Sequence, residues 1–307
     1  MNVERVKNMK VVCVGHSTYD ITLLMDEFPQ ENKKYRINNR MECGGGPASN
    51  AAYLLAKWGM DTTIASVIGD DFYGNKVIEE FQKVGCNTDY LEQKTGYNTS
   101  SSYIIANTVS GSRTIITTKS DPVRKLSNAL EVDANVILID GEHPDSAEEL
   151  LKYNGKNKIT VLDAGRLNFD TRHLGKMVEY LICSKDFAEE FSNTKLNADD
   201  LDGLVKCHKE MSSYFNNHVI ITLEDRGSFT HIDGHYEIIP SIKVQTVDST
   251  GAGDIFHGAF TYFISNGYSL RETIRYASIT AAISVTRMGA RNSIPALQEV
   301  LDYDNII

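Results

Sequence analysis

The sequence lacks several features that would point to whole classes of protein. Its 307 residues contain no apolar run of about 18 residues, so no segment is predicted to span a membrane. The five cysteines form no C-x-x-C pair and their number is odd, which argues against both a disulfide framework and a zinc site. The formal net charge is −10, whereas a general nucleic-acid-binding protein needs a basic surface.

Two common nucleotide-binding motifs are also missing. No G-x-x-x-x-G-K-[ST] segment occurs, which excludes the P-loop mechanism. No G-x-G-x-x-G segment opens a strand–helix–strand unit, which disfavours a Rossmann dehydrogenase. The first ten residues are polar and lack the apolar core of a secretion signal. Since unpaired cysteines suit a reducing compartment, we expect a cytoplasmic protein.

The composition is that of an ordinary globular protein, with 41% hydrophobic and 23% charged residues. Short apolar runs alternate with helical patterns along most of the chain. The expected strands are 10–14, 62–68, 136–139, 159–162, 180–183 and 219–223, followed by a hairpin at 228–240. The expected helices are 48–58, 74–84, 146–153, 201–215, 252–265 and 270–286. This alternation predicts an α/β fold, with a mostly parallel central sheet flanked by helices on both faces.

Two β-rich inserts, at about 17–40 and 98–118, interrupt this alternation. We expect them to form a small sheet beside the main one, which we call the lid. No linker separates them from the rest, so we expect a single α/β domain over residues 1–307. The lid strands would present free edges, and pairing of two lids would cover them. A homodimer through the lid is therefore expected.

The strongest local signal is the segment 248–254 (DSTGAGD). Gly251 and Gly253 flank Ala252 just before an apolar helix, and glycine permits the unusual turn that such a junction needs. A helix N-terminus offers unpaired N–H groups and the positive end of the helix dipole. The segment is therefore predicted to bind a phosphate or a developing oxyanion, with Asp254 at the mouth of the site. Taken alone, Asp254 could equally be a helix cap.

The chain as a whole resembles the ribokinase-like (PfkB) family of carbohydrate kinases. Segment 248–254 is similar to the C-terminal signature of that family, and segment 45–50 (GGPASN) is similar to its N-terminal signature, G-G-x-x-x-N. Segments 219–227 (VIITLEDRG) and 282–295 (AISVTRMGARNSIP) resemble its nucleotide segment and the segment that closes its adenine pocket and cation loop. The resemblance implies the ribokinase-like fold with a small β-sheet lid.

The resemblance also implies a reaction, in which ATP with Mg²⁺ phosphorylates a hydroxyl of a small sugar. Asp254 would be the general base. The N–H groups of Gly251, Ala252 and Gly253 would stabilise the transferred phosphoryl group. The residues implied for the sugar are Asp20, Gly45, Gly46, Asn50, Glu142 and Lys34. Those implied for the nucleotide are Thr222, Gly227 and Ser284. A loop for a monovalent cation, from which we expect activation by K⁺, would comprise Asp248, Thr250, Arg287, Gly289 and Ser293.

The sequence departs from the family pattern in two places. Many members carry an N-x-x-E motif where this chain has the segment 184–187 (SKDF), which puts the family's secondary metal or phosphate regulation in doubt. Glu224 stands where the nucleotide segment usually has glycine. Because an acidic side chain beside phosphates would repel them, we expect Glu224 to point away from the nucleotide.

The identity of the sugar depends on Glu142. Segments 44–47 (GGGP), 32–35 (NKKY) and 255–258 (IFHG) resemble the fructokinase and sulfofructose kinase-like branch of the family. That branch places an arginine where this chain has Glu142. A carboxylate would repel a sulfonate or phosphate by about 4 kcal/mol at 4 Å and an effective dielectric of 20. We therefore expect a neutral sugar such as ribose or a ketohexose.

Other substrates and one other class of function stay open at this point. A nucleoside would need aromatic side chains at the lid, and Tyr19, Tyr35 and Tyr103 are the candidates. An anionic sugar (sulfofructose, a sugar phosphate or ketodeoxygluconate) would make Lys34 the residue of interest. A protein that binds sugar without turnover, as a regulator, would keep the same fold.

Overall fold

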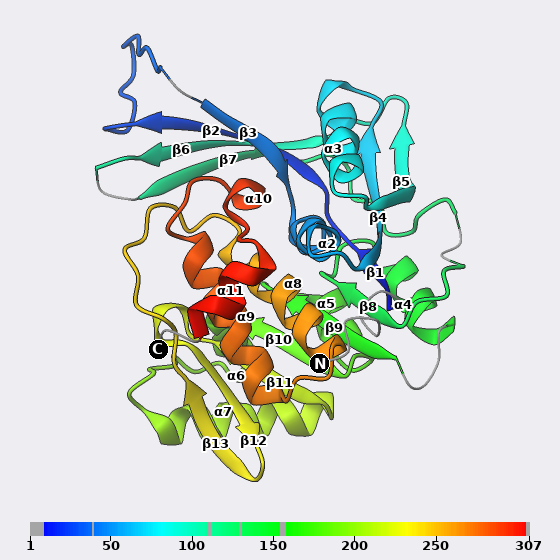
Figure 1. The fold of residues 1–307 in the computed structure, drawn as a ribbon, viewed down its shortest axis with the longest axis vertical. Coiled ribbons are helices and arrows are strands. Elements are labelled where there is room, and N and C mark those ends of the chain that lie inside the picture. The colour runs from blue at the N-terminus through cyan, green and yellow to red at the C-terminus, as the bar shows by residue number, and fades with distance from the viewer. Residues whose placement is uncertain (1–8, 39, 110–111, 129–130, 154–157, 305–307) are drawn as a thin grey trace.

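The computed structural model describes residues 9–38, 40–109, 112–128, 131–153 and 158–304. Two sheets are present (Figure 1): a large one lies among the helices of the main body, and a small one projects above it. Positions 39, 110 and 111, which belong to the two predicted inserts, lie outside the described residues.

The large sheet has nine strands, and those from β5 across to β11 are parallel. The hairpin of β12 and β13 extends one edge with antiparallel pairing. The strands in order are β13 (His235–Ile239), β12 (Ser228–Ile232), β11 (His218–Thr222), β10 (Tyr180–Ser184), β9 (Ile159–Ala164), β8 (Val136–Ile139), β1 (Lys10–Val14), β4 (Asp61–Gly69) and β5 (Asn87–Lys94). The central strands are nearly continuous apolar runs, as strands covered on both faces require.

The small sheet has four strands and corresponds to the predicted lid. Its strands in order are β3 (Arg40–Gly45), β2 (Thr18–Met25), β6 (Ser100–Asn107) and β7 (Arg113–Thr118). Strands β2 and β6 pair in parallel, while β3 and β7 pair antiparallel at the two edges. In the β2–β3 pairing Thr18 lies opposite Gly45. The end of the hairpin that carries these two residues is the one that meets the main body (Figure 1).

Helices cover both faces of the large sheet. One face packs against α2 (Pro47–Lys57), α3 (Phe72–Lys83), α8 (Ala252–Ser265), α9 (Leu270–Ser284) and α11 (Leu297–Asp304). The other packs against α4 (Pro144–Tyr153), α5 (Phe169–Leu174), α6 (Lys185–Ser192) and α7 (Leu201–Phe215). A short α10 (Ala290–Ser293) and a 3₁₀ turn, η1 (Glu224–Arg226), lie in the connections. Alternate residues of β1 supply the two cores.

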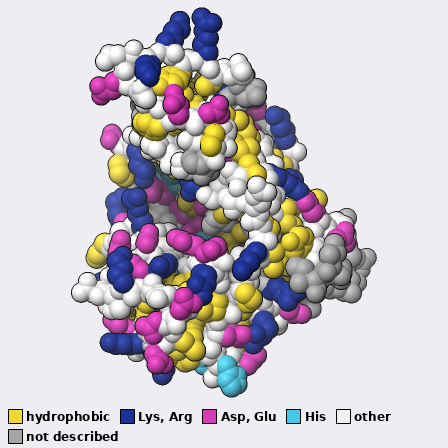
Figure 2. All heavy atoms as spheres, turned by 90° about the vertical axis from the view of Figure 1, so that its left-hand side faces the viewer, with side chains coloured by type: hydrophobic (Ala, Val, Ile, Leu, Met, Phe, Trp, Pro, Cys, Tyr) yellow, Lys and Arg dark blue, Asp and Glu magenta, His cyan; other side chains and the backbone are white. Residues whose placement is uncertain are grey.

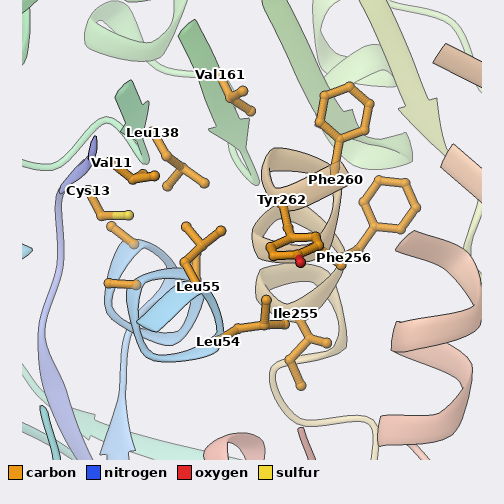
Figure 3. Close-up of a cluster of buried hydrophobic side chains, with 14 of the residues drawn as sticks. Val11, Cys13, Leu54, Leu55, Leu138, Val161, Ile255, Phe256, Phe260 and Tyr262 are labelled. Atoms are coloured by element: carbon orange, nitrogen blue, oxygen red, sulfur yellow. The ribbon is translucent and has the colours of Figure 1, made fainter. Parts of the chain in front are cut away.

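The contact between α2 and α8 positions the candidate site. Leu54 and Leu55 of α2 lie beside Ile255 of α8, in the core that also includes Phe260 (Figure 3). All four side chains are fully buried, and each contributes roughly 1.5–3 kcal/mol to folding. The two helices approach so closely that a Cβ on Gly258 would lie 3.0 Å from the Ala51 Cα atom. Their N-terminal turns are therefore held next to each other.

The predicted fold class is confirmed, but several predicted boundaries differ. Only β2 lies within the first insert (about 17–40), because β3 begins at the last residue of that insert and continues to Gly45. Described residues 26–38 form no helix or strand. Strand β5 was not predicted, because its residues are mostly polar and only Leu91 is buried. The short helices α5 and α6 were also missed, although Asn168 and Ser184 cap them with side-chain oxygens.

Two predicted absences can be compared with the structure. All five cysteines are free thiols in buried positions. Within the described ranges, no helix combines the length and the apolar character that crossing a bilayer requires.

Candidate active site

The N-terminus of α8 has the backbone geometry predicted for an anion site. Gly251 precedes the helix with φ 74°, a conformation that favours glycine. A Cβ built on Gly253 would meet nothing within 4 Å, so the first turn of the helix faces open space there. The first N–H groups of a helix lack partners within it, and the helix dipole makes this end electropositive. The Ala252 N–H group donates backward to the Ser249 carbonyl oxygen (3.3 Å). Gly251, Ala252 and Gly253 lie at this end of the helix, with Asp254 in the same turn.

Helix α2 brings the second predicted motif to the same place. Gly46 precedes it with φ 97°, and Asn50 lies in its first turn, where its N–H group donates to the Gly46 carbonyl oxygen (2.8 Å). The Asn50 side-chain Nδ2 atom donates to Oδ2 of Asp254 at 2.7 Å. Two residues 204 positions apart in the sequence are thus in direct contact.

Asp20, a residue of the lid, lies against the glycine run that precedes α2. It lies on β2, and a Cβ on Gly45 would come within 2.2 Å of the Asp20 Oδ2 atom, so its carboxyl group lies directly against the Gly45 backbone. Asp20 is 9% exposed, and its buried Oδ1 atom has no hydrogen-bond partner among the described residues. Burial raises the pKa of Asp20 to about 6, although a hydrogen bond from Ser102 opposes this. An unsatisfied buried acceptor is what a ligand hydroxyl would pair with.

The surface is hollowed between the lid and the main body, and acidic side chains gather along this hollow (Figure 2). Burial and the nearby Asp163 carboxyl group raise the pKa of Asp254 to about 7. The hydrogen bond from Asn50 and the neighbouring His257 act in the opposite direction. A carboxyl group with a pKa near neutrality is well suited to accept a proton at physiological pH.

His257 and Asp163 form a buried pair close to Asp254. His257, one turn later on α8, places Nδ1 2.6 Å from the Gly253 carbonyl oxygen and 3.1 Å from Oδ2 of Asp163, at the end of β9. Its Nε2 atom is 3.3 Å from the Ile182 carbonyl oxygen. Burial raises the pKa of Asp163 to about 8 and lowers the pKa of His257. Burial therefore disfavours the charged form of both side chains of the pair.

Asp140 ties three segments around the site. Its carboxylate accepts from the N–H groups of His16 (2.8 Å), Ala48 (3.1 Å) and Glu142 (2.9 Å). It therefore links the end of β1, the start of α2 and the loop after β8. The predicted sugar residue Glu142 is partly buried in that loop, close enough to His16 to influence its titration.

Lys34 is the predicted sugar residue that the structure does not bring to this cluster. It is exposed in the described segment 26–38, at the opposite end of the β2–β3 hairpin from Gly45. The length of strand between them corresponds to roughly 15–20 Å.

The predicted nucleotide residues lie on two different elements. Thr222 ends β11, and Gly227 follows the turn η1 with φ 106°. Ser284 is buried at the end of α9, where its hydroxyl donates to the Ala281 carbonyl oxygen, so no described contact joins it to Thr222 or Gly227. Glu224 is exposed and lines a surface hollow together with Lys185.

The predicted cation loop is held together by Asp248. Its Oδ1 atom accepts from the N–H and hydroxyl groups of Thr250 (2.9 and 2.7 Å), and its Oδ2 atom accepts from the Gly289 N–H group (2.9 Å). The Ser293 N–H group in turn donates to the Gly289 carbonyl oxygen (3.2 Å). The Arg287 side chain instead pairs with Glu299. In the part of the chain that the structure describes, no cluster of His, Cys, Asp or Glu has the arrangement of a metal site.

Several residues in the site were missed by sequence reasoning. Asp140 and Asp163 each end an apolar strand, which was the available signal, since polar residues that end parallel strands lie at one edge of the sheet. Arg291 and Glu80 carried no such signal. They meet through long-range packing, described below.

Comparisons with known proteins agree with this geometry. Residues 8–297 match the family described as pfkB family carbohydrate kinase. The chain is 25% identical over 306 residues to the ribokinase of Staphylococcus aureus, covering 95% of this chain and 98% of that one. Among solved structures, it is similar to the ribokinase of Thermotoga maritima (TM-score 0.80, 26% identity, 97% and 99% covered). It is also similar to Arabidopsis thaliana ribokinase complexed with ribose and ATP (TM-score 0.79, 25% identity, 96% and 97% covered).

The family match extends over nearly all of the chain, and the motifs predicted for that family meet at one site. This chain therefore belongs to the pfkB family of carbohydrate kinases, and it is a phosphotransferase whose acceptor is a hydroxyl group of a sugar.

Proposed function

We propose that this protein is an ATP-dependent kinase of a small neutral sugar, with Asp254 as its general base. The observation that carries the proposal is the 2.7 Å hydrogen bond between Asn50 and Asp254 at the N-terminus of α8. It joins a residue suited to bind a sugar hydroxyl with a carboxylate suited to deprotonate one, beside N–H groups suited to bind phosphate.

The proposed reaction uses three features of the site. Asp254 takes the proton from the attacking hydroxyl, a contribution of typically 10²–10⁴-fold. The sugar oxygen then forms a bond to the γ-phosphorus of Mg²⁺-bound ATP, and the bond to the β–γ bridging oxygen breaks. The N–H groups of Gly251, Ala252 and Gly253 stabilise charge on the transferred group, and each such donor is typically worth about 10²–10³-fold. Mg²⁺ arrives with the nucleotide as part of the substrate.

A neutral sugar suits the charges around the site. The unpaired Oδ1 atom of Asp20 can accept a hydrogen bond from a sugar hydroxyl, and Asn50 can both donate and accept. Several acidic side chains, Asp20, Glu142 and Asp254 among them, would repel an anionic sugar. The position of Lys34, at the far end of the lid hairpin, further supports a neutral substrate over an anionic one. Ribose is the first candidate, since a similar solved structure is a ribokinase complexed with ribose and ATP.

The nucleoside alternative is less well supported. Of its three candidate tyrosines, Tyr19 is only 4% exposed and stacks on Tyr73 (ring centroids 5.1 Å apart), so it belongs to the core of the lid. Tyr103 is 40% exposed, and its hydroxyl pairs with that of Tyr73.

A substrate panel tests the proposal. ADP release would be measured with ribose, fructose, other hexoses, ketodeoxygluconate, sulfofructose and nucleosides, and ³¹P NMR would identify the phosphorylated hydroxyl. We expect the highest kcat/KM with a neutral sugar. A preference for an anionic sugar or a nucleoside would overturn the substrate assignment. Sugar binding without turnover on any member would overturn the kinase proposal itself and favour the regulator.

A further inference from the structure

Arg291 is a buried cation close to the candidate base. It lies in α10 and is only 2% exposed. Its Nη1 atom pairs with Oε2 of Glu80 on α3 at 2.8 Å, and its Nε atom donates to Oδ1 of Asn50 at 3.2 Å. The guanidinium carbon lies 4.5 Å from the ring centroid of Phe81, within the range of a cation–π contact.

The surrounding backbone is shaped to receive this side chain. A Cβ on Gly44, the first residue of the glycine run in β3, would lie 2.1 Å from the Arg291 Nη1 atom. The Gly44 N–H group also donates to Oε2 of Glu80 at 2.9 Å. The close approach of the guanidinium group to the strand therefore explains why position 44, just before the segment 45–50, is also a glycine.

The contact with Arg291 fixes the orientation of the Asn50 amide. An arginine side chain has donors and no acceptor, so the Asn50 atom facing it must be the carbonyl oxygen. The amide nitrogen then points to Asp254, where it donates to Oδ2. Without Arg291, the amide oxygen could also face Asp254, where it would accept a hydrogen bond from the protonated carboxyl group and so favour the protonated form.

We propose that Arg291 is a positioning residue for the base: anchored by Glu80, it holds Asn50 in the amide orientation that donates to the Asp254 carboxylate. This inference rests on the proposed role of Asp254 and adds to it a chain of contacts from α3 through α10 and α2 to α8. Arg291 acts through Asn50 and is not itself a catalytic residue.

The consequence concerns the proton affinity of Asp254. The groups that face it are Asn50 on α2, His257 on α8, Asp163 at the end of β9 and Asp140 after β8. Burial and the two aspartates raise the pKa of Asp254, while the Asn50 hydrogen bond and His257 lower it. Loss of the oriented Asn50 donor removes a lowering influence, so the pKa of Asp254 rises.

The test compares Arg291→Met, which keeps the length and packing of the side chain, with Arg291→Lys, which keeps its charge. Arg271→Met, at an exposed arginine paired with Glu237, is the matched control. The Asp254 carboxyl carbon would be titrated by ¹³C NMR in the ligand-free protein and assigned with Asp254→Asn. We expect Arg291→Met to raise the pKa of Asp254 by about one unit, because a hydrogen bond to a charged group is worth about a factor of ten. Arg291→Lys should raise the pKa of Asp254 by less than Arg291→Met does, and Arg271→Met should leave that pKa unchanged.

Kinetics provide a second readout. In Arg291→Met, the apparent pKa of the acid limb of the kcat/KM pH profile should rise by the same amount. A merely structural role would instead lower activity equally at every pH. An unchanged Asp254 titration in folded Arg291→Met would overturn the inference while leaving the proposed function intact. Absence of sugar phosphorylation by the wild-type enzyme would overturn the proposed function, and the ligand-free titration would still decide the role of Arg291.

Arg291→Met leaves the partly buried Glu80 with the Gly44 N–H donor and without its cationic partner, which could prevent folding. The double variant Arg291→Met/Glu80→Gln removes both charges and avoids that penalty. It should show the same rise in the pKa of Asp254, and a wild-type value in the double variant would equally overturn the inference.

Discussion

At the scale of single residues, the site concentrates carboxyl groups whose proton affinity is raised by burial. Asp20, Asp254 and Asp163 have pKa values of about 6, 7 and 8, respectively. In each case burial is the largest cause, since a low-dielectric surrounding disfavours the charged form. Groups of this kind suit binding and proton transfer, and they reduce stability whenever they are ionised.

The first prediction concerns Asp20. Replacing it by alanine removes the unpaired buried acceptor and leaves a sugar hydroxyl without its partner, a cost of about 1–3 kcal/mol. Asp20→Ala should therefore raise the KM for the sugar by roughly 5- to 150-fold, while the KM for ATP stays the same. Asp26→Ala, at an exposed lid carboxylate, is the control and should change neither. A sugar KM within twofold of wild type would remove Asp20 from the sugar site.

The second prediction concerns pH. Asp254 must be ionised to accept a proton, so activity should rise with pH through about 7. Stability should change in the opposite direction. The folded pKa values of Asp20, Asp254 and Asp163 lie above the unfolded value, so their contribution to stability is present below about pH 4 and is lost as pH rises through their folded values to about 8.

Initial rates and denaturant unfolding, measured between pH 5 and 8.5, check whether activity rises while stability falls with pH. In Asp254→Asn the fall in stability should be smaller than in wild type, because one titrating group is gone. An equal fall in both proteins would show that Asp254 titrates at an ordinary carboxyl pKa.

At the scale of elements, the N-termini of α2 and α8 form the site because the helices pack along their lengths. The sequence signals for both were local: glycines before each helix and apolar faces within it. Their meeting could be predicted only through the family resemblance, because no local pattern states that Asn50 lies beside Asp254. Arg291 was missed for the same reason, since it acts through contacts with residues far away in the sequence.

The third prediction concerns the cation loop. The turn 247–250 is tied to the end of α9, because the N–H groups of Val247 and Asp248 donate to the Val285 carbonyl oxygen (2.7 and 3.1 Å). It continues directly into Gly251, so a cation bound by backbone carbonyls there would order the anion site. Activity should be higher in K⁺ than in Na⁺ or tetramethylammonium, and Asp248→Ala should abolish the difference. Equal rates of wild type in all three salts would exclude a cation site.

At the scale of the whole molecule, the alternation of strands and helices was sufficient to predict the parallel sheet, and the two β-rich inserts that interrupt it predicted the separate lid. The segment 26–38, which has neither helix nor strand, and strand β5 were not predicted correctly. Their residues carry no clear apolar period, and β5 gains its place by pairing with β4. Lys34 illustrates the limit for the site, because its distance from Gly45 depends on how the chain returns between β2 and β3.

The fourth prediction concerns assembly. Strand β7 forms an edge of the lid, and its Ile115 and Ile116 side chains are 48% and 55% exposed. Pairing of two lids would cover these side chains and the open edge. Sedimentation at micromolar concentration should show a dimer, and Ile115→Lys/Ile116→Lys should be a monomer. Tyr153→Lys, at an exposed residue of α4, is the control. A monomeric wild type would contradict the assembly through the lid.

The central claim, that Asp254 is the base of a sugar kinase, is tested most directly by kcat of Asp254→Asn with the preferred sugar. Asparagine keeps the shape of the side chain and loses the basic carboxylate, so kcat should fall by at least about 10²-fold. Sugar affinity, measured by calorimetry, should stay within a few-fold of wild type, and the exposed control Asp61→Asn should retain full activity. Near-normal turnover by folded Asp254→Asn would contradict the account.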